Sequence, residues 1–391
     1  MRKKCLVRQP LFYNTALLIA KRSIHKGVYK VAHDHIKPPV EVQFASELKL
    51  LRDNDHSNPK PENWALSPKA VRSFILGDEQ LNISQKYYGN DALVERCIIT
   101  LAGNRGLMLV GEPGTAKTML SELLSVAISG TSINTIQGTA GTTDDNIKYS
   151  WNYALLLAKG ASRESLVPAP LYVGMEKGLI TRFEEITRCQ AEVQDTLISV
   201  MSDKVMSIPE LGETGILFAK PGFNIIGTAN TRDRGVNEMS SALKRRFNFE
   251  TVFPINNVAL ECQIIEEQCT TLIGPNAKSL IDKNIVNLIA TTFHELRTGQ
   301  SADGAKIDPP SAVMSTAEAV SVYYQTALTA HYYNADKLSV DNLVQNLIGA
   351  IIKESRDDIP KLKNYFNTII KSRVKNSKLW ESFYEARKWI S

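Results

Sequence analysis

Residues 107–118 read Leu-Met-Leu-Val-Gly-Glu-Pro-Gly-Thr-Ala-Lys-Thr, and this stretch decides the fold. Its four apolar residues predict a buried parallel strand, and the apolar spacing after Thr118 predicts a helix. A glycine-bearing turn between a strand and a helix directs backbone N–H groups and the helix dipole at phosphate. The Lys117 ammonium suits the β- and γ-phosphates of a triphosphate, and the Thr118 hydroxyl suits Mg²⁺. We therefore expect ATP and Mg²⁺ as cofactors, bound by Gly111, Glu112, Pro113, Gly114, Thr115, Ala116, Lys117 and Thr118.

Ala116 stands directly before the lysine, where this type of turn usually has glycine. We expect this position to be entering the helix, where alanine is well tolerated. The alternative interpretation of the stretch is an ordinary glycine-containing turn. The strand, the turn, the Lys-Thr pair and the helix together favour phosphate binding.

The order of patterns along the chain predicts the domain organisation. Apolar runs at 178–183 and 223–228 predict two more strands, each followed by a helical pattern. Strands that alternate with helices indicate an α/β domain with a parallel sheet. After Pro254 the helical patterns continue to the end of the chain. We expect a basic N-terminal extension and linker at 1–80, an α/β core at 81–255 and a helical C-terminal domain at 256–391.

The composition is that of a soluble globular protein, with 43% hydrophobic and 22% charged residues. Five cysteines without a CxxC pair suggest neither a zinc site nor a disulfide framework. Residues 1–33 carry basic but no acidic side chains, and their apolar stretch at 11–20 is too short to span a bilayer. We expect a cytoplasmic protein, with an organellar matrix as the alternative because transit peptides are basic and acid-poor.

Two carboxylates, Glu184 and Glu185, follow the predicted strand at 178–183. ATP hydrolysis needs one carboxylate in the shell of Mg²⁺ and a second that orients or deprotonates the attacking water. We expect Glu184 to serve the metal and Glu185 to be catalytic. The Glu184 carboxylate reaches one methylene further than an aspartate would, and Thr181 and Arg182 are polar residues within the strand, which together suggest slow turnover. The alternative is a charged strand end in solvent.

Three further motifs occur in order: Tyr88-Gly89-Asn90, Thr228-Ala229-Asn230 and Lys244-Arg245-Arg246-Phe247. Together with the features above, they make residues 85–390 resemble the MoxR group of AAA+ ATPases, in a branch that shares features with MCM-like helicase motors. The resemblance implies an AAA+ P-loop NTPase core and a helical lid. It also implies that Asn230 is a catalytic residue near the γ-phosphate and that Tyr88 and Gly89 lie on the adenine side.

The same resemblance implies an arginine that reaches the ATP of a neighbouring subunit, and therefore a ring, with a homo-hexamer as the expected assembly. Arg246 is the expected catalytic arginine because a phenylalanine follows it, and Arg245 is the reserve. The alternatives are a loop asparagine at 230 and a solvated basic helix end at 245–246. One feature of the family is missing, because residues 314–319 lack the arginine known as sensor 2. Either another cation such as Lys306 takes its place, or closure of the lid depends less on contact with the nucleotide.

Two stretches are similar to inserts that face the central pore of such rings. The first is 138–145, and the second is a predicted hairpin with strands near 205–208 and 216–219 and a tip at 209–215. Both tips are acidic, whereas a motor that grips nucleic acid needs basic residues there. If the tips face the pore, they would repel a nucleic-acid backbone, and a protein client is favoured.

Three functions remain open. The first is a MoxR-like ATPase that remodels or matures a protein partner, in this family often one with a von Willebrand factor A domain. The second is a nucleic-acid-stimulated motor, for which the basic C-terminal helix with Lys361, Lys363, Lys371, Arg373, Lys375 and Lys378 is the main argument. The third is a protein that uses ATP binding, with little hydrolysis, to control an interaction.

Overall fold

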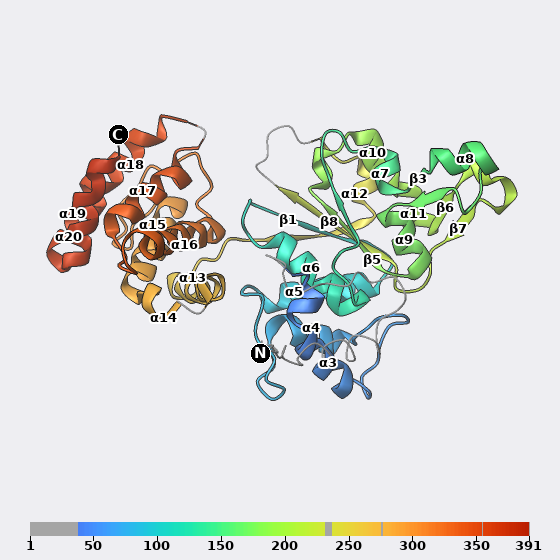
Figure 1. Cartoon of the computed structure of the whole chain (residues 1–391), viewed down its shortest axis with the longest axis horizontal. Helices are drawn as coiled ribbons and strands as arrows, with labels where there is room; N and C mark the ends of the chain where they lie inside the picture. The colour runs from blue at the N-terminus through green and yellow to red at the C-terminus, as the bar shows by residue number, and fades with distance from the viewer. Residues whose placement is uncertain (1–37, 231–236, 275–276, 354, 391) are drawn as a thin grey trace, which may run out of the picture.

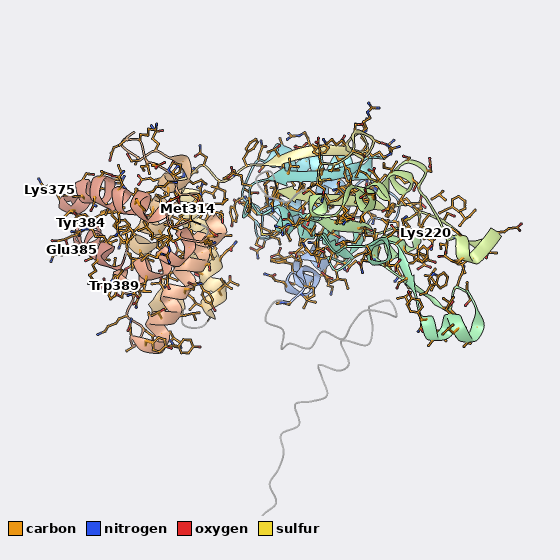
Figure 2. All side chains as sticks on the ribbon, turned by 90° about the horizontal axis from the view of Figure 1, so that it is seen from above. Lys220, Met314, Lys375, Tyr384, Glu385 and Trp389 are labelled. Carbon is orange, nitrogen blue, oxygen red and sulfur yellow. The ribbon has the colours of Figure 1, made fainter. Side chains whose placement is uncertain are left out.

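The computed structural model describes residues 38–230, 237–274, 277–353 and 355–390. The basic segment at 1–33 lies outside the described residues. The described chain forms a sheet domain in the middle, a helical lid at one end and a projecting pair of hairpins at the other (Figure 1). Figure 2 shows the same order from above. Lys220 lies on the side of the sheet domain from which the hairpins project, and Met314 lies within the lid at the other end.

The central sheet confirms the predicted α/β class. Five parallel strands stand in the order β2-β5-β8-β1-β9. They are β1 (Gly106–Gly111), β2 (Thr135–Gln137), β5 (Ile180–Glu184), β8 (Asn224–Asn230) and β9 (Phe247–Val252). The apolar runs identified in the sequence are β1, β5 and β8, the three central strands. Gly111 pairs in register with Asn230, so the carboxyl ends of β1 and β8 meet at one edge of the sheet.

Helices cover both faces of the sheet, because side chains alternate across each strand. Leu107 and Leu109 of β1 join the core on one face, and Met108 joins the core on the other. The first face packs against α2 (Val40–Gln43), α3 (Ala45–Asn54), α4 (Pro68–Leu76), α5 (Asp91–Ala102) and α6 (Lys117–Ser129). The second packs against α7 (Asp144–Ile147), α9 (Pro170–Lys177), α10 (Ala191–Asp195), α11 (Leu197–Asp203) and α12 (Ser241–Lys244).

The N-terminal helices α2, α3 and α4 belong to the region that we expected as an extension and linker. Val40, Leu48 and Phe74 from these helices are buried in the same core cluster as β1 and α6. Residues 40–76 therefore pack as part of the sheet domain. The domain boundary at residue 80 stays a prediction.

The C-terminal region is helical, as expected. Its long helices enclose a separate hydrophobic core that includes Phe293, Tyr323 and Phe366. Its elements are α13 (Val258–Ile273), α14 (Ala277–Leu280), α15 (Lys283–Thr298), α16 (Thr316–Tyr333), α17 (Val340–Ile351), α18 (Asp358–Tyr365), a π-helix (Phe366–Ile370), α19 (Lys371–Arg373) and α20 (Lys378–Glu385). Among the helices that the structure describes, none is both long and apolar enough to cross a membrane.

Two small hairpins form the projecting part of the molecule, which we call the arm (residues 149–168 and 205–218). The first hairpin is β3 (Tyr149–Trp151) and β4 (Leu166–Pro168), joined through α8 (Tyr153–Lys159). The second is β6 (Val205–Ser207) and β7 (Ile216–Phe218), which matches the predicted hairpin. Glu210 between β6 and β7 accepts hydrogen bonds from Tyr149 Oη at 3.0 Å and Trp151 Nε1 at 3.4 Å, which connect the two hairpins.

The expectation for the first insert was wrong in its position. Residues 138–145 form the loop before α7 and the start of that helix, and the segment that projects is α8 (Figure 1). The sequence did not reveal the hairpin because a helix, α8, separates its two strands. The strands of the second hairpin are equally short, but the loop between them contains proline and glycine, which is a recognisable turn signal.

Candidate functional site

The predicted phosphate-binding turn connects the end of β1 to the start of α6. Gly114 has a φ of +76°, and an added Cβ there would lie 2.4 Å from the Ser315 side chain of the lid. Ala116 has a φ of +66° and is the N-cap of α6, which begins at Lys117. Our expectation that Ala116 enters the helix was therefore wrong. The left-handed conformation explains why glycine is usual at this position, and alanine is strained there because its Cβ crowds the backbone.

Lys117 projects into the turn that it follows. Its Nζ donates to the carbonyl oxygens of Gly111 at 3.2 Å and Glu112 at 2.7 Å. The Thr115 hydroxyl also donates to the Glu112 carbonyl, at 2.9 Å, and helps to close the turn. The ammonium is thus held at the mouth of the turn, where it can bind a phosphate oxygen.

Glu184 is the last residue of β5, lies next to the phosphate-binding turn and is 4% exposed. Its Oε2 accepts hydrogen bonds from the hydroxyls of Thr118 at 3.0 Å and Thr228 at 2.8 Å. Its Oε1 accepts from Ser121 Oγ at 2.6 Å and from Arg182 Nη2 at 2.7 Å. A hydroxyl and a carboxylate side by side are the hard oxygen donors that Mg²⁺ prefers, so Thr118 and Glu184 fit this ion.

Glu185 is the N-cap of a short 3₁₀ helix, η1 (Ile186–Arg188), and has a φ of +54°. Asn230 Nδ2 donates to Glu185 Oε1 at 2.8 Å, and Arg188 Nε lies 3.8 Å from Glu185 Oε2. The Glu185 backbone N–H donates to the Thr228 hydroxyl at 3.0 Å. The two predicted catalytic residues therefore contact each other, although 45 positions separate them in the sequence.

One cavity of about 400 Å³ brings these groups together. Its walls include Tyr88, Glu185, Asn230 and the turn residues 112–118. Among the described residues, the lining does not include Gly89, Gly111, Glu184 or Arg246. Gly111 and Glu184 lie directly behind the lining, where they bond to Lys117 and Thr118 respectively.

Tyr88 connects the sheet domain to the lid beside this cavity. Its hydroxyl donates to Glu267 Oε2 of α13 at 2.5 Å. Burial, and then the hydrogen bond to Glu267, raise the pKa of the Tyr88 phenol to about 12. The tyrosine therefore remains a neutral donor across the whole physiological pH range.

The lid supplies the second wall of the cavity. Among the described residues that the lid contributes to this wall, Arg297 of α15 is the only basic one. Arg297 donates to Glu261 Oε1 at 2.7 Å, to the Met314 carbonyl at 2.7 Å and to the Ile255 carbonyl at 3.0 Å. Thr316 at the start of α16 donates to the same Glu261 oxygen at 2.7 Å. The sequence did not indicate Arg297, because the arginine of the family is expected near residues 314–319, whereas Arg297 lies earlier in the chain, in α15. Lys306 is exposed and lies outside the lining.

The predicted arginines at 245–246 follow α12, away from the cavity. The Arg246 guanidinium donates to Ser202 Oγ and to the Ala242 carbonyl of its own chain. Arg245 is exposed, and its side chain forms no hydrogen bond or ion pair with the described residues. Neither arginine belongs to the same subunit's site, so any role in hydrolysis requires a neighbouring chain.

Two protein-family models and a long relative match this chain. Residues 106–247 match a family model described as an AAA domain of the dynein-related subfamily, and residues 259–391 match the C-terminal domain of YehL-like AAA+ ATPases. The uncharacterized protein YehL of Escherichia coli (strain K12) is 49% identical over 356 residues, which cover 90% of this chain and 96% of that protein.

More distant similarities were also found. The uncharacterized protein SH1500 of Staphylococcus haemolyticus (strain JCSC1435) is 26% identical over 196 residues, or 50% of this chain and 69% of that protein. The crystal structure of NtrX from Brucella abortus in complex with ADP aligns with a TM-score of 0.44 and 11% identity, over 77% of this chain and 64% of NtrX. The two family models and the long match to YehL show that the chain belongs to the family of YehL-like AAA+ ATPases.

Proposed function

We propose that the protein is a MoxR-like ATPase that couples binding and hydrolysis of ATP with Mg²⁺ to remodelling or maturation of a protein partner. The observation that carries the catalytic part is the convergence of Lys117, Thr118, Glu185 and Asn230 on one cavity, with Glu184 directly behind it. These groups supply the phosphate, metal and water contacts that phosphoryl transfer requires.

Each residue has a separate task in this proposal. The N–H groups of the turn and Lys117 bind the phosphates, while Thr118 and Glu184 hold Mg²⁺. The metal ion would neutralise charge that develops on the phosphate oxygens. Glu185 orients the attacking water and takes its proton, and Asn230 fixes the Glu185 carboxylate through the 2.8 Å hydrogen bond.

We further propose that the active assembly is a ring, with a homo-hexamer as the first candidate. An arginine of one subunit would then stabilise the charge at the γ-phosphate of the next. Arg246 is our first candidate and Arg245 the second, although the exposed Arg245 guanidinium has fewer bonds to give up. Arg246→Ala should lower turnover without dispersing the assembly, and an unchanged rate would transfer the role to Arg245.

A protein client is favoured over nucleic acid by the chemistry of the arm. Tyr153 and Leu157 of α8 are 70% and 89% exposed, and Ile216 and Phe218 of β7 are 47% and 67% exposed. Lys159 at the end of α8 is paired with Glu164 at 2.8 Å. Exposed apolar side chains with a neutralised lysine suit a polypeptide better than a phosphate backbone.

The basic C-terminal region gives less support to a nucleic-acid motor than its sequence suggested. Arg373 is buried and paired with Glu295 at 2.5 Å, and Lys361 is paired with Asp358 at 3.2 Å. Lys375 lies at the end of the lid that is far from the arm (Figure 2). The expected partner is therefore a protein, with one that carries a von Willebrand factor A domain as the first candidate. We place this activity in the cytoplasm.

Phosphate release from ATP, measured with and without single-stranded DNA, tests the proposal. We expect turnover that DNA does not stimulate, and a loss of about 100-fold or more in Glu185→Gln because general-base residues contribute ~10²–10⁴ in rate. The matched control is Glu192→Gln on the exposed surface of α10, which should keep the full rate. Stimulation by DNA would favour the motor, and no turnover by any assembled form would favour an ATP-dependent interaction protein.

The client can be sought with the same variant. Glu185→Gln should bind ATP without cleaving it and so retain its partner during affinity capture. A polypeptide held by Glu185→Gln with ATP, but not by Lys117→Met, would identify the client. Equal recovery with both variants would show that the capture does not depend on the nucleotide.

A further inference from the structure

Arg182 is a buried cation on the strand that carries the metal-binding carboxylate. It precedes Glu184 by two positions on β5, so both side chains lie on the same face of the strand. The Arg182 residue is 4% exposed. Its Nε donates to Ser121 Oγ at 3.0 Å, its Nη1 donates to the Ser132 carbonyl at 2.7 Å, and its Nη2 donates to Glu184 Oε1 at 2.7 Å.

The two oxygens of Glu184 therefore face different surroundings. Oε2 accepts hydrogen bonds from the Thr118 and Thr228 hydroxyls, and Thr118 is the other residue that would hold the metal ion. Oε1 points the other way, toward Ser121 and Arg182. A second carboxylate, Glu122, lies 3.6 Å from Arg182 Nη2, but it is less deeply buried than Glu184. Four hydrogen-bond donors therefore hold the Glu184 carboxylate in place, and Arg182 supplies most of the opposing charge.

This ion pair changes what Glu184 can do for a cation. A charge so deeply buried is only weakly screened by solvent, so a neighbouring guanidinium strongly reduces the attraction of the carboxylate for a second cation. The glutamate side chain, one methylene longer than aspartate, can contact Thr118 with one oxygen and Arg182 with the other. The arginine and the length of the glutamate therefore act together.

We propose that Arg182 is a positioning residue that neutralises and orients Glu184, so that the site binds a divalent cation tightly only together with the phosphates of a nucleotide. The proposal rests on the proposed ATPase function, since it concerns the same metal position. It assigns a role to the polar strand that the sequence suggested would slow turnover. Arg182 controls the order in which the site is filled, because the metal ion alone meets a carboxylate that is already paired.

Binding of Mn²⁺, followed by electron paramagnetic resonance in the absence of nucleotide, tests this role directly. Arg182→Gln keeps a polar side chain but removes the charge, and we expect its Mn²⁺ affinity to rise at least about tenfold over the wild type. Arg182→Lys keeps the charge and should remain within about threefold of the wild type. In the Arg182→Gln/Glu184→Gln double variant, the gain should disappear because the unpaired carboxylate is removed.

Several outcomes would overturn the proposal. A folded Arg182→Gln protein with wild-type Mn²⁺ affinity would reduce Arg182 to a packing role, as would equal affinities of the Gln and Lys variants. If Arg182→Gln does not fold, the Mn²⁺ affinity of the wild-type protein with and without ADP tests the proposal instead. Its Mn²⁺ affinity should be at least about tenfold weaker without ADP than with saturating ADP, and similar affinities would contradict the proposal. Because no turnover is measured, a wild type that follows these affinities but does not hydrolyse ATP would refute only the ATPase function.

Discussion

The two walls of the cavity are built in different ways. The sheet-domain wall presents reactive groups at or just after the carboxyl ends of β1, β5 and β8, including Lys117, Glu185 and Asn230. The lid wall presents mostly apolar residues, such as Ile264 and Val320, and one arginine. Arg297 is occupied by Glu261 and by two backbone carbonyls. The first wall carries the side chains that can bind or react with a nucleotide, whereas the polar groups of the second wall mainly stabilise the lid itself.

This difference predicts which property a substitution in each wall should change. Changes in the sheet-domain wall should alter nucleotide binding or turnover with little effect on folding. Changes in the lid wall should first alter the stability of the lid, because Arg297 and Thr316 both donate hydrogen bonds to the buried Glu261 carboxylate. The predictions below test this division.

Arg297→Met should have the largest effect. It removes one partner of a buried ion pair and leaves Glu261, which is 1% exposed, without its main counter-charge. Breaking such a pair costs about 3–5 kcal/mol of the free energy of unfolding. Urea denaturation followed by far-ultraviolet circular dichroism measures the loss. Arg105→Met on the exposed surface is the control and should change stability by less than about 0.5 kcal/mol. A stable Arg297→Met protein with impaired ATP binding would instead show that Arg297 acts on the nucleotide.

Lys117→Met should weaken ATP binding by about 100-fold, which corresponds to about 2.7 kcal/mol. The reason is the loss of charge-assisted hydrogen bonds to phosphate, each worth about 1.5–3 kcal/mol. Titration with a fluorescent ATP analogue measures the affinity. The control is Lys69→Met on the exposed side of α4, which should bind as the wild type does. The melting temperature of Lys117→Met without nucleotide should change little. A large drop would place Lys117 among the structural residues and blur the contrast between the two walls.

The same contrast explains what could be predicted from the sequence. The turn at 111–118 and the strands β1, β5 and β8 were identified because their chemistry and period are local. The pairing of Glu185 with Asn230 follows from the parallel sheet, which places the strand ends at one edge. The Arg297 network was missed because its members at 255, 261, 297 and 314–316 share no local pattern. The left-handed conformation of Ala116 was missed because alanine itself favours a helix.

Ala116→Gly should stabilise the protein by about 0.5–1 kcal/mol. Glycine relieves the left-handed strain of about 1–2 kcal/mol, and its greater backbone entropy in the unfolded chain offsets part of this gain. Thermal denaturation without nucleotide measures the change. Ala154→Gly, on the exposed surface of α8, is the control and should destabilise by about 0.5–1 kcal/mol. Two substitutions of the same type would thus act in opposite directions, and destabilisation by both would contradict the strain at Ala116.

Tyr88→Phe should have the smallest effect, although its hydrogen bond connects the sheet domain to the lid. The bond to Glu267 is at the surface, where water can replace either partner, so its loss should cost only a few tenths of a kcal/mol. Equilibrium unfolding should therefore be almost unchanged, while ADP affinity measured by calorimetry should fall by less than about threefold. Glu267→Gln removes the charge but keeps an acceptor, and we expect it to match the wild type. If Tyr88→Phe instead weakened ADP binding tenfold or more, the placement of the lid against the sheet domain would depend on this contact, and the lid wall would have to be counted among the binding groups.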